Sequence, residues 1–166
     1  IPSPKYFEVG CAPGKWMVYV AEEMKCSPAG VEYIHPAADA TEKNLSLCGV
    51  EGRVNCADFF SIAPEPIYDI VASYGFIEHF KNFDEVFERH VGFLKPGGIL
   101  VLGIPRFRGL NYLIQKLIDF DNSRPLLPSH YLEIMDLKTF REQGRAIDHG
   151  AGRAEGVRRR QVCVSC

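Results

Sequence analysis

Hydrophobic and polar positions along the chain alternate between two periods, one typical of buried strands and one of amphipathic helices. Short apolar runs predict strands at residues 6–10, 30–33, 53–56, 68–73 and 99–104. Apolar residues at helical spacing predict intervening helices at residues 15–24, 37–47 and 83–94. Because strands and helices alternate, the sequence predicts an α/β fold in three layers around a mainly parallel sheet.

The predicted helices also make particular residues candidates for the core. In the first helix the apolar stripe consists of Trp16, Val20 and Met24. The helix after the fourth strand carries apolar residues as far as Leu94, and residues 95–98 read Lys-Pro-Gly-Gly. Proline ends a helix and glycine permits unusual backbone angles, so a turn is expected there before the last strand.

Beyond residue 104 the pattern becomes less regular. Apolar residues at helical spacing predict one more helix: Leu110, Leu113, Ile114 and Leu117. Asp136 could cap a short helix through Gln143. From residue 145 onward the chain is rich in arginine and has almost no apolar periodicity, although residues 161–164 are faintly strand-like. We therefore expect a domain at 1–144 and an irregular basic tail at 145–166 that is disordered or non-native.

Composition and charge are those of an ordinary soluble globular domain. The net charge is −2, so no nucleic-acid partner is evident. The sequence has no apolar run of the roughly 18 residues that a membrane-spanning helix needs, and no membrane span is expected. The six cysteines are scattered, and we interpret them as reduced thiols of a cytoplasmic protein.

The junction between the first strand and the first helix carries the first candidate motif. It reads Glu8-Val9-Gly10-Cys11-Ala12-Pro13-Gly14. Glycines there let the backbone turn tightly and approach a ligand, and the following helix offers unpaired N–H groups. Ala12 and Lys15 stand where a dinucleotide-binding fingerprint has its second and third glycines. The motif therefore disfavours a pyrophosphate-binding loop.

Further candidate residues follow the later strands. Glu32 ends the second strand about twenty residues after the first glycine, where an acid can accept hydrogen bonds from ribose hydroxyls. Asp58 and Phe59 follow the third strand. Residues 68–80 read YDIVASYGFIEHF, and residues 94–98 read LKPGG before a buried strand.

In this order the motifs resemble those of class I, Rossmann-like S-adenosylmethionine-dependent methyltransferases. The resemblance covers residues 6–144: the loop 8–14 resembles motif I, and the segments 68–80 and 94–98 resemble later hallmarks of the family. It implies a Rossmann-like sheet and S-adenosylmethionine as the cofactor. A complete fold of this family continues into two more strands, so we expect a truncated chain whose C-terminal strand pair is missing or incomplete.

The resemblance also implies which residues surround the cofactor. In the family the first-strand acid and the glycine loop surround the methionine moiety, the acid after the second strand binds the ribose, and the acid after the third binds the adenine amino group. Aromatic residues beside the last two offer their rings to the adenine. The residues implied here are Glu8, Gly10, Cys11, Ala12, Gly14, Glu32, Tyr33, Asp58, Phe59 and Ser73.

Several of these residues also have a purely structural interpretation. The loop 8–14 could be a plain strand-to-helix turn that needs glycines for geometry alone. Glu32 could be a solvated surface acid, and Asp58 could cap a helix while Phe59 packs in the core. The ordered series of motifs is more specific than any one of these residues, and it favours the cofactor site.

Two histidines are candidate catalytic groups. A general base is needed when the methyl acceptor must lose a proton, and histidine can take a proton near neutral pH. His79 is the first candidate and His130 the second, although each could instead orient a neighbour by a hydrogen bond. Some related phenol methyltransferases bind a divalent metal with a Glu-His pair like Glu78-His79 and an acid three positions earlier. Gly75 holds that position, so no metal is expected.

Three functional classes are compatible with these residues. The first is methyl transfer from S-adenosylmethionine to a small-molecule acceptor. A nicotinamide-dependent oxidoreductase shares the fold and Glu32, but the missing middle glycine counts against it. A non-catalytic relative that keeps the scaffold for binding is the third. The sequence leaves the acceptor and the oligomeric state open.

Overall fold

The protein forms a parallel sheet with helices on both faces. The computed structural model describes residues 3–107, 109–120, 122–123, 125–133, 135 and, for the backbone, 161–165. The sheet contains β1 (Tyr6–Val9), β2 (Ala29–Glu32), β3 (Arg53–Cys56), β4 (Tyr68–Tyr74), β5 (Leu94–Gly103) and β6 (Gln161–Ser165). The strand order is β3-β2-β1-β4-β5-β6, and every pairing is parallel. The predicted α/β architecture around a mainly parallel sheet is confirmed.

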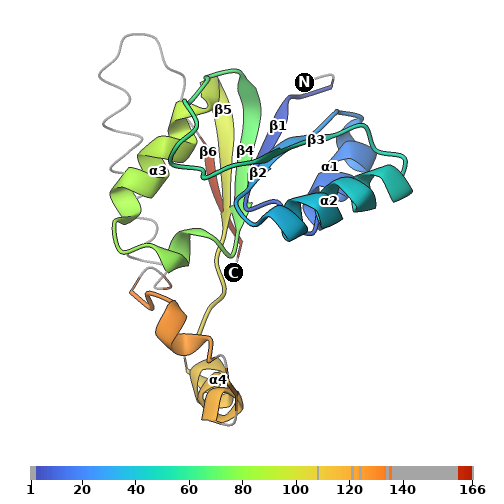
Figure 1. The fold of residues 1–166 in the computed structure, drawn as a ribbon. Coiled ribbons are helices and arrows are strands. Elements are labelled where there is room, and N and C mark those ends of the chain that lie inside the picture. The colour runs from blue at the N-terminus through green and yellow to red at the C-terminus, as the bar shows by residue number, and fades with distance from the viewer. Residues whose placement is uncertain are drawn as a thin grey trace.

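The helices complete three layers. They are α1 (Lys15–Met24), α2 (His35–Leu47), α3 (Phe83–Gly92) and α4 (Leu110–Phe120), with short 3-10 helices η1 (Ile77–His79) and η2 (Leu127–Ser129). Figure 1 shows α1 and α2 on one side of the sheet and α3 on the other, while α4 projects away from the sheet. None of the helices in the described ranges is long and apolar enough to cross a membrane.

Alternate residues of the central strands point to opposite faces of the sheet and supply two cores. On the α3 side, Phe7 and Val9 of β1 pack with Val86 and Phe87. On the α1 and α2 side, Tyr6 of β1 belongs to a smaller cluster: Tyr6, Cys11, Met17, Cys26, Leu45 and Ala72. The buried strands are therefore covered on both faces, as the apolar runs in the sequence predicted.

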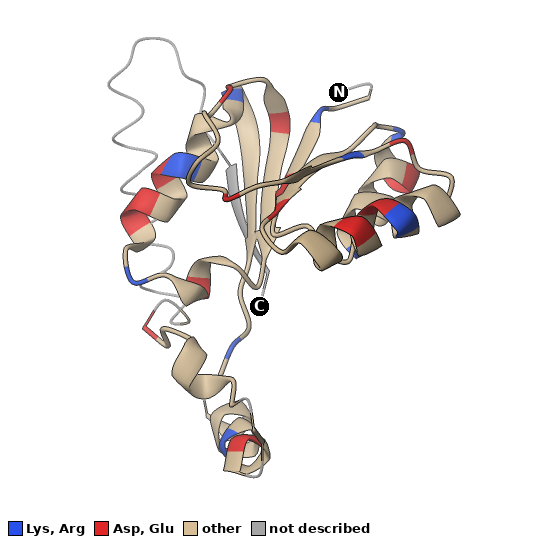
Figure 2. Ribbon diagram, viewed as in Figure 1, with Lys and Arg blue, Asp and Glu red and all other residues tan. Residues whose placement is uncertain are grey.

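The outer surface carries mixed charge. Figure 2 shows acidic and basic residues side by side on α2 and on α3, so neither helix presents a uniformly basic face. This mixture agrees with the small net charge of −2.

The buried face of α1 differs from the one predicted. Met17 is fully buried, whereas Trp16 and Met24 are 37% and 43% exposed. The ring of Trp16 stacks against Tyr74, with 4.8 Å between ring centroids. The helix thus turns Met17 toward the core, and Trp16 packs on the residue that ends β4.

At residues 95–98 the structure has part of a strand instead of the predicted turn. Leu94 does not end α3 but begins β5, pairing with Tyr68 before the register jumps to Ile70 and Ile99. The four residues between Leu94 and Ile99 therefore oppose Asp69 alone and form a bulge in the strand. The amine of Lys95 lies 3.0 Å from each carboxylate oxygen of Asp69, and this ion pair holds the bulge against β4.

Of the segments predicted beyond residue 135, the structure describes one, residues 161–165. Residues 161–165, which the sequence marks as faintly strand-like within an irregular tail, form β6 beside β5. Beyond β5, β6 is the strand that the described part of the chain contributes. The helix predicted from Asp136 to Gln143 and the remainder of the tail lie outside the described residues. The division at residue 144 stays a prediction.

A pair of leucine substitutions tests the core. Leu102 in β5 is fully buried, and Leu117 in α4 is 76% exposed. We expect Leu102→Ala to lower the free energy of unfolding by about 2–5 kcal/mol, because it leaves a cavity. Leu117→Ala should change it by no more than about 0.5 kcal/mol. Urea unfolding followed by circular dichroism measures both values, and equal losses would contradict the described packing.

Candidate functional site

The strand order locates the candidate site. β1 lies between β2 and β4, so the chain winds outward in one direction from β1 and returns to begin the other half at β4. At such a switch point the loops after the two neighbouring strands separate, and ligands of open parallel sheets bind at the carboxyl ends of the strands there. The loop 10–14 follows β1, and η1 follows β4.

The loop after β1 requires glycine at both ends. Gly10 and Gly14 have φ angles of 69° and 89°, which side chains rarely tolerate. The backbone amide of Gly10 donates a 2.9 Å hydrogen bond to the carbonyl of Val31, which fixes the loop against β2. A Cβ on Gly10 would lie 3.2 Å from the ring of Phe76, and one on Gly14 would lie 3.0 Å from Thr41. The predicted glycine turn is therefore present and tightly enclosed.

The start of α1 faces this loop. Gly14 is the N-cap residue, and no side chain caps the helix by a hydrogen bond. The first N–H groups of a helix have no partner within the helix, so they are available to a carboxylate or another polar group. Of the loop residues between the two glycines, Cys11 is buried and Ala12 is partly exposed.

Glu8 is a buried acid at the base of the loop. It is 3% exposed, and the hydroxyl of Tyr6 donates a 2.9 Å hydrogen bond to its carboxylate. Burial raises the pKa of Glu8 from 4.5 to about 8, although the bond from Tyr6 acts in the opposite direction. Glu8 is therefore mostly protonated at neutral pH.

Cys11 shares this environment. Burial, together with the charges of Glu8 and Glu32, raises the pKa of the Cys11 thiol to about 12. A thiol with so high a pKa is a poor nucleophile at neutral pH.

Glu32 and Tyr33 lie at the end of β2. One carboxylate oxygen of Glu32 accepts a 2.9 Å hydrogen bond from the amide of Ile34, and the side chain is partly exposed. Tyr33 is 74% exposed, so its ring is open to a ligand. Both positions fit the roles that the family resemblance implies.

Asp58 and Phe59 occupy different environments. The exposed carboxylate of Asp58 accepts a 2.9 Å hydrogen bond from the amide of Phe60 and stabilises the turn after β3. Phe59 is 4% exposed, and its ring contacts Phe76 and Phe93 at 5.7 Å between centroids. Phe59 is therefore a core residue, the alternative that the sequence left open, because neighbouring aromatic rings enclose it.

Ser73 is a buried polar residue of β4. It is 1% exposed, near the carboxyl end of β4 and paired in register with Val9 of β1. Its hydroxyl has no hydrogen-bond partner within the described part of the chain. A buried hydroxyl without a partner costs about 1–3 kcal/mol, so a ligand group that reaches it gains by satisfying it.

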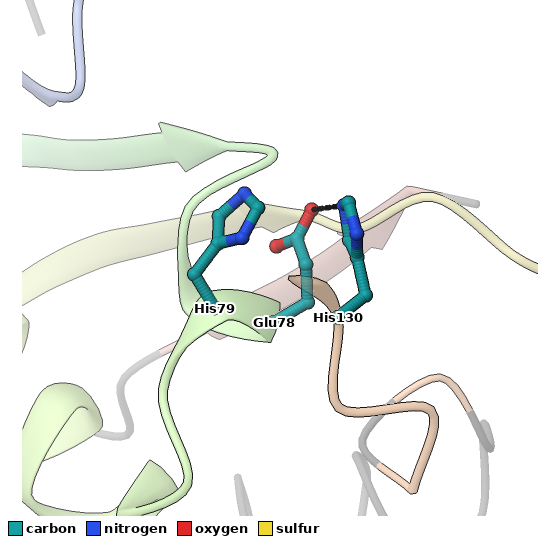
Figure 3. Close-up of side chains that lie close together, drawn as sticks. All are labelled: Glu78, His79 and His130. Atoms are coloured by element: carbon teal, nitrogen blue, oxygen red, sulfur yellow. Dashed lines mark ion pairs between the residues drawn. The ribbon is translucent and has the colours of Figure 1, made fainter. Parts of the chain in front are cut away.

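Both candidate catalytic histidines lie beside Glu78. Figure 3 shows His79 and His130 on either side of the Glu78 carboxylate, although His130 comes from the segment after η2. The amide of Tyr131 donates a 2.8 Å hydrogen bond to the carbonyl of Glu78, which ties the two segments together. Nε2 of His130 lies 4.0 Å from a carboxylate oxygen of Glu78. The sequence proposed the two histidines separately and considered Glu78 only as part of a Glu-His metal pair that Gly75 disfavours.

Comparison with known proteins identifies the family to which the chain belongs. A family model described as a methyltransferase domain matches residues 7–102, more than half of the chain. The match runs from β1 to β5 and includes the glycine loop, Glu32, Asp58 and η1. A search of curated proteins finds no match.

Solved structures share the fold at low sequence identity. A protein from Methanococcus maripaludis described as an S-adenosyl-L-methionine-dependent methyltransferase is 16% identical, with a TM-score of 0.65 over 89% of this chain and 69% of that chain. Mycolic acid cyclopropane synthase, complexed with SAH and CTAB, is 19% identical, with a TM-score of 0.66 over 87% and 54%. The [4+2]-cyclase SpnF is 21% identical, with a TM-score of 0.54 over 59% and 37%. This chain spans 37–69% of their lengths, and its predicted Rossmann-like fold is confirmed.

The pKa of Glu8 predicts a pH dependence of stability. Because folding raises this pKa from 4.5 to about 8, the contribution of Glu8 is complete below pH 4.5 and is lost as the pH rises through 8. Between pH 5 and pH 8.5 the parent should therefore lose on the order of 4 kcal/mol more unfolding free energy than Glu8→Gln. Urea unfolding across this range measures the slopes.

The exposed acid Glu42 on α2 provides the control for this experiment. Glu42→Gln should keep the slope of the parent protein, because a solvated carboxylate has nearly the same environment in the folded and unfolded chain. Equal slopes in the parent and in Glu8→Gln would show that Glu8 is ionised in the folded protein at neutral pH.

Proposed function

The chain belongs to the methyltransferase-domain family, and from this premise we propose that it binds S-adenosylmethionine and transfers the methyl group to a small-molecule acceptor. The observation that carries the proposal is the enclosed glycine loop at the switch point between β1 and β4. This loop lies within the matched residues and has the polar groups that such a cofactor needs around it.

Three features of the loop region support cofactor binding. Gly10 and Gly14 have positive φ angles, so the backbone turns tightly from β1 into α1. The uncapped start of α1 can bind the carboxylate of the methionine moiety through its N–H groups. One carboxylate oxygen of Glu32 accepts a hydrogen bond from the amide of Ile34, and the second oxygen can accept hydrogen bonds from the ribose hydroxyls.

The adenine end of the proposed site uses fewer residues than the sequence implied. Tyr33 is exposed and offers a ring face, and the exposed Asp58 has a second carboxylate oxygen to accept from the adenine amino group. Phe59 supports this region from the core. Ser73 offers its unpartnered hydroxyl at the carboxyl end of β4.

S-adenosylmethionine, when bound, supplies a methyl group that its sulfonium centre already activates. The protein then has to hold the acceptor in line with that methyl group and exclude water from the crevice. Fixing such a geometry can lower a barrier by roughly 7–11 kcal/mol. The protein needs no covalent nucleophile for this role, which agrees with the raised pKa of Cys11.

Proton removal from a hydroxyl acceptor is the proposed role of His79. Its Nδ1 lies 3.0 Å from the carbonyl of Ser129 and must carry a proton to bond with it, so Nε2 is the basic nitrogen. His79 is exposed, whereas the side chain of His130 is 7% exposed beside Glu78. We therefore place His79 on the acceptor side and give His130 an orienting role.

The other interpretations differ in their support. A nicotinamide cofactor is disfavoured, because Ala12 and Lys15 replace two fingerprint glycines and the matched family is one of methyltransferases. A non-catalytic binding domain keeps the same cofactor site and differs only in turnover. A cytoplasmic location remains a prediction from the cysteine pattern.

Removal of the Glu32 carboxylate tests the ribose contact. We expect Glu32→Ala to weaken binding of S-adenosylmethionine by about 10–100-fold, because charge-assisted hydrogen bonds contribute roughly 1.5–3 kcal/mol. Isothermal titration calorimetry measures the affinity, with Glu42→Ala on α2 as the control that should bind like the parent. A folded parent protein that takes up no S-adenosylmethionine would overturn the proposed function.

Binding should also release a proton at pH 7. Glu8 is largely protonated in the free protein, since its pKa is about 8, and the positive charges of the methionine moiety favour its ionised form. Calorimetry in buffers of different ionisation enthalpy should therefore give release of up to about one proton. Glu8→Gln should release less, and equal release by both proteins would assign the proton to another group.

A further inference from the structure

Glu78, His79 and His130 form a cluster that methyl transfer does not by itself require. Glu78 and His79 lie in η1, and His130 directly follows η2. One donor atom from each side chain can be chosen so that all three lie within 4.8 Å of one another. Among the described residues this is a group of one carboxylate and two imidazoles, a mixed donor set rather than a patch of acids.

Backbone carbonyls orient both imidazoles in the same way. Nδ1 of His79 lies 3.0 Å from the carbonyl oxygen of Ser129, and Nδ1 of His130 lies 2.6 Å from that of Leu126. A carbonyl oxygen can only accept, so both Nδ1 atoms carry the proton. In a neutral imidazole with this tautomer, Nε2 has the free lone pair.

A serine hydroxyl reinforces the orientation of His130. The hydroxyl of Ser129 donates a 2.7 Å hydrogen bond to the carbonyl of Leu126, so toward Nδ1 of His130, 3.0 Å away, it acts as an acceptor. The ring of Phe107 packs edge-on against the imidazole, with 5.5 Å between centroids. Metal-binding histidines are oriented by such contacts at the nitrogen that faces away from the metal.

The buried carboxylate of Glu78 is an independent observation that points to a ligand. Its side chain is fully buried, and neither carboxylate oxygen has a hydrogen-bond partner in the described part of the chain. The approach of His130 to 4.0 Å is too long for a hydrogen bond. Burying a carboxylate without hydrogen bonds is costly, and a cation between the three side chains would reduce that cost.

We propose that Glu78, His79 and His130 bind a divalent first-row transition metal ion. In this proposal Nε2 of His79 and of His130 are metal ligands, which replaces the base role of His79 and the orienting role of His130 given above. Two imidazole nitrogens and one carboxylate oxygen suit zinc and ferrous iron, and they leave further coordination positions open. Bonds of about 2.0–2.2 Å hold the donor atoms of a tetrahedral site roughly 3.3 Å apart, so the three side chains close inward on binding. The cation lies near the cofactor loop, because Phe76 at the start of η1 contacts Gly10.

This proposal revises the expectation from sequence. No metal was expected because Gly75 offers no carboxylate three residues before Glu78. A Cβ on Gly75 would lie 3.6 Å from a Glu78 oxygen, so that side of the carboxylate holds no donor. His130, from a segment about fifty residues away, approaches another side of Glu78 and supplies the third ligand.

The test is metal binding by the full chain after exhaustive treatment with a chelator. Titration with Zn²⁺ in a calorimeter should give one equivalent bound at the cluster, and Co²⁺ should give the visible d–d absorption of a low-symmetry N/O site. Each of Glu78→Gln, His79→Ala and His130→Ala should weaken Zn²⁺ binding at least tenfold. Circular dichroism must show that each variant is folded, and the three variants give independent tests of one site.

Two controls identify other sources of binding. His35→Ala removes an exposed histidine paired with Asp39 on α2 and should leave Zn²⁺ affinity unchanged. The double variant Cys163→Ser and Cys166→Ser removes a CxxC pair present in the sequence and should retain the Co²⁺ spectrum. Absence of binding by the parent, or retention of full affinity in the three cluster variants, overturns the proposal. Both results are independent of S-adenosylmethionine binding.

Discussion

The close approach of the first loop to the sheet is the constraint on which the candidate site depends. Glu8 of β1 is opposite Gly30 of β2, and a Cβ on Gly30 would lie 2.7 Å from the Cβ of Cys11. The loop can therefore fold back over β2 only because Gly30 has no side chain. On the other side of the loop, the ring of Phe76 packs against Gly10. Motif-based reasoning identified Gly10 and Gly14 but missed Gly30, since a glycine within a strand gives no local signal of what lies above it.

Three of the buried polar residues lie at the carboxyl edge of the sheet. Glu8, Ser73 and Glu78 are each nearly inaccessible, and they lie at or just beyond the carboxyl ends of β1 and β4. The interior between the strands and α3 contains mainly apolar side chains, with the fully buried His90 of α3 as an exception. Polar groups in such positions reduce stability unless something satisfies them, so their placement at the switch point connects the fold to ligand binding.

The two proposals depend on different parts of this edge. Cofactor binding depends on the loop after β1 and the end of β2, whereas the metal proposal depends on η1 and the segment after η2. The hydrogen bond from Tyr131 to Glu78 fixes the second region and brings His130 to its position. Phe76, which directly precedes η1, lies beside Gly10, so the two regions adjoin.

Local pattern was enough to predict the strands, the helices and the glycine loop. These features depend on residues within a few positions of each other: apolar periodicity, glycine at a turn and an acid after a strand. The tertiary structure alone decided that Met17 rather than Trp16 is buried, that Leu94 begins a strand, and that Phe59 belongs to the core. It also decided that His130 reaches Glu78, because contacts between distant segments depend on the path of the chain and the packing of its layers, which no local pattern encodes.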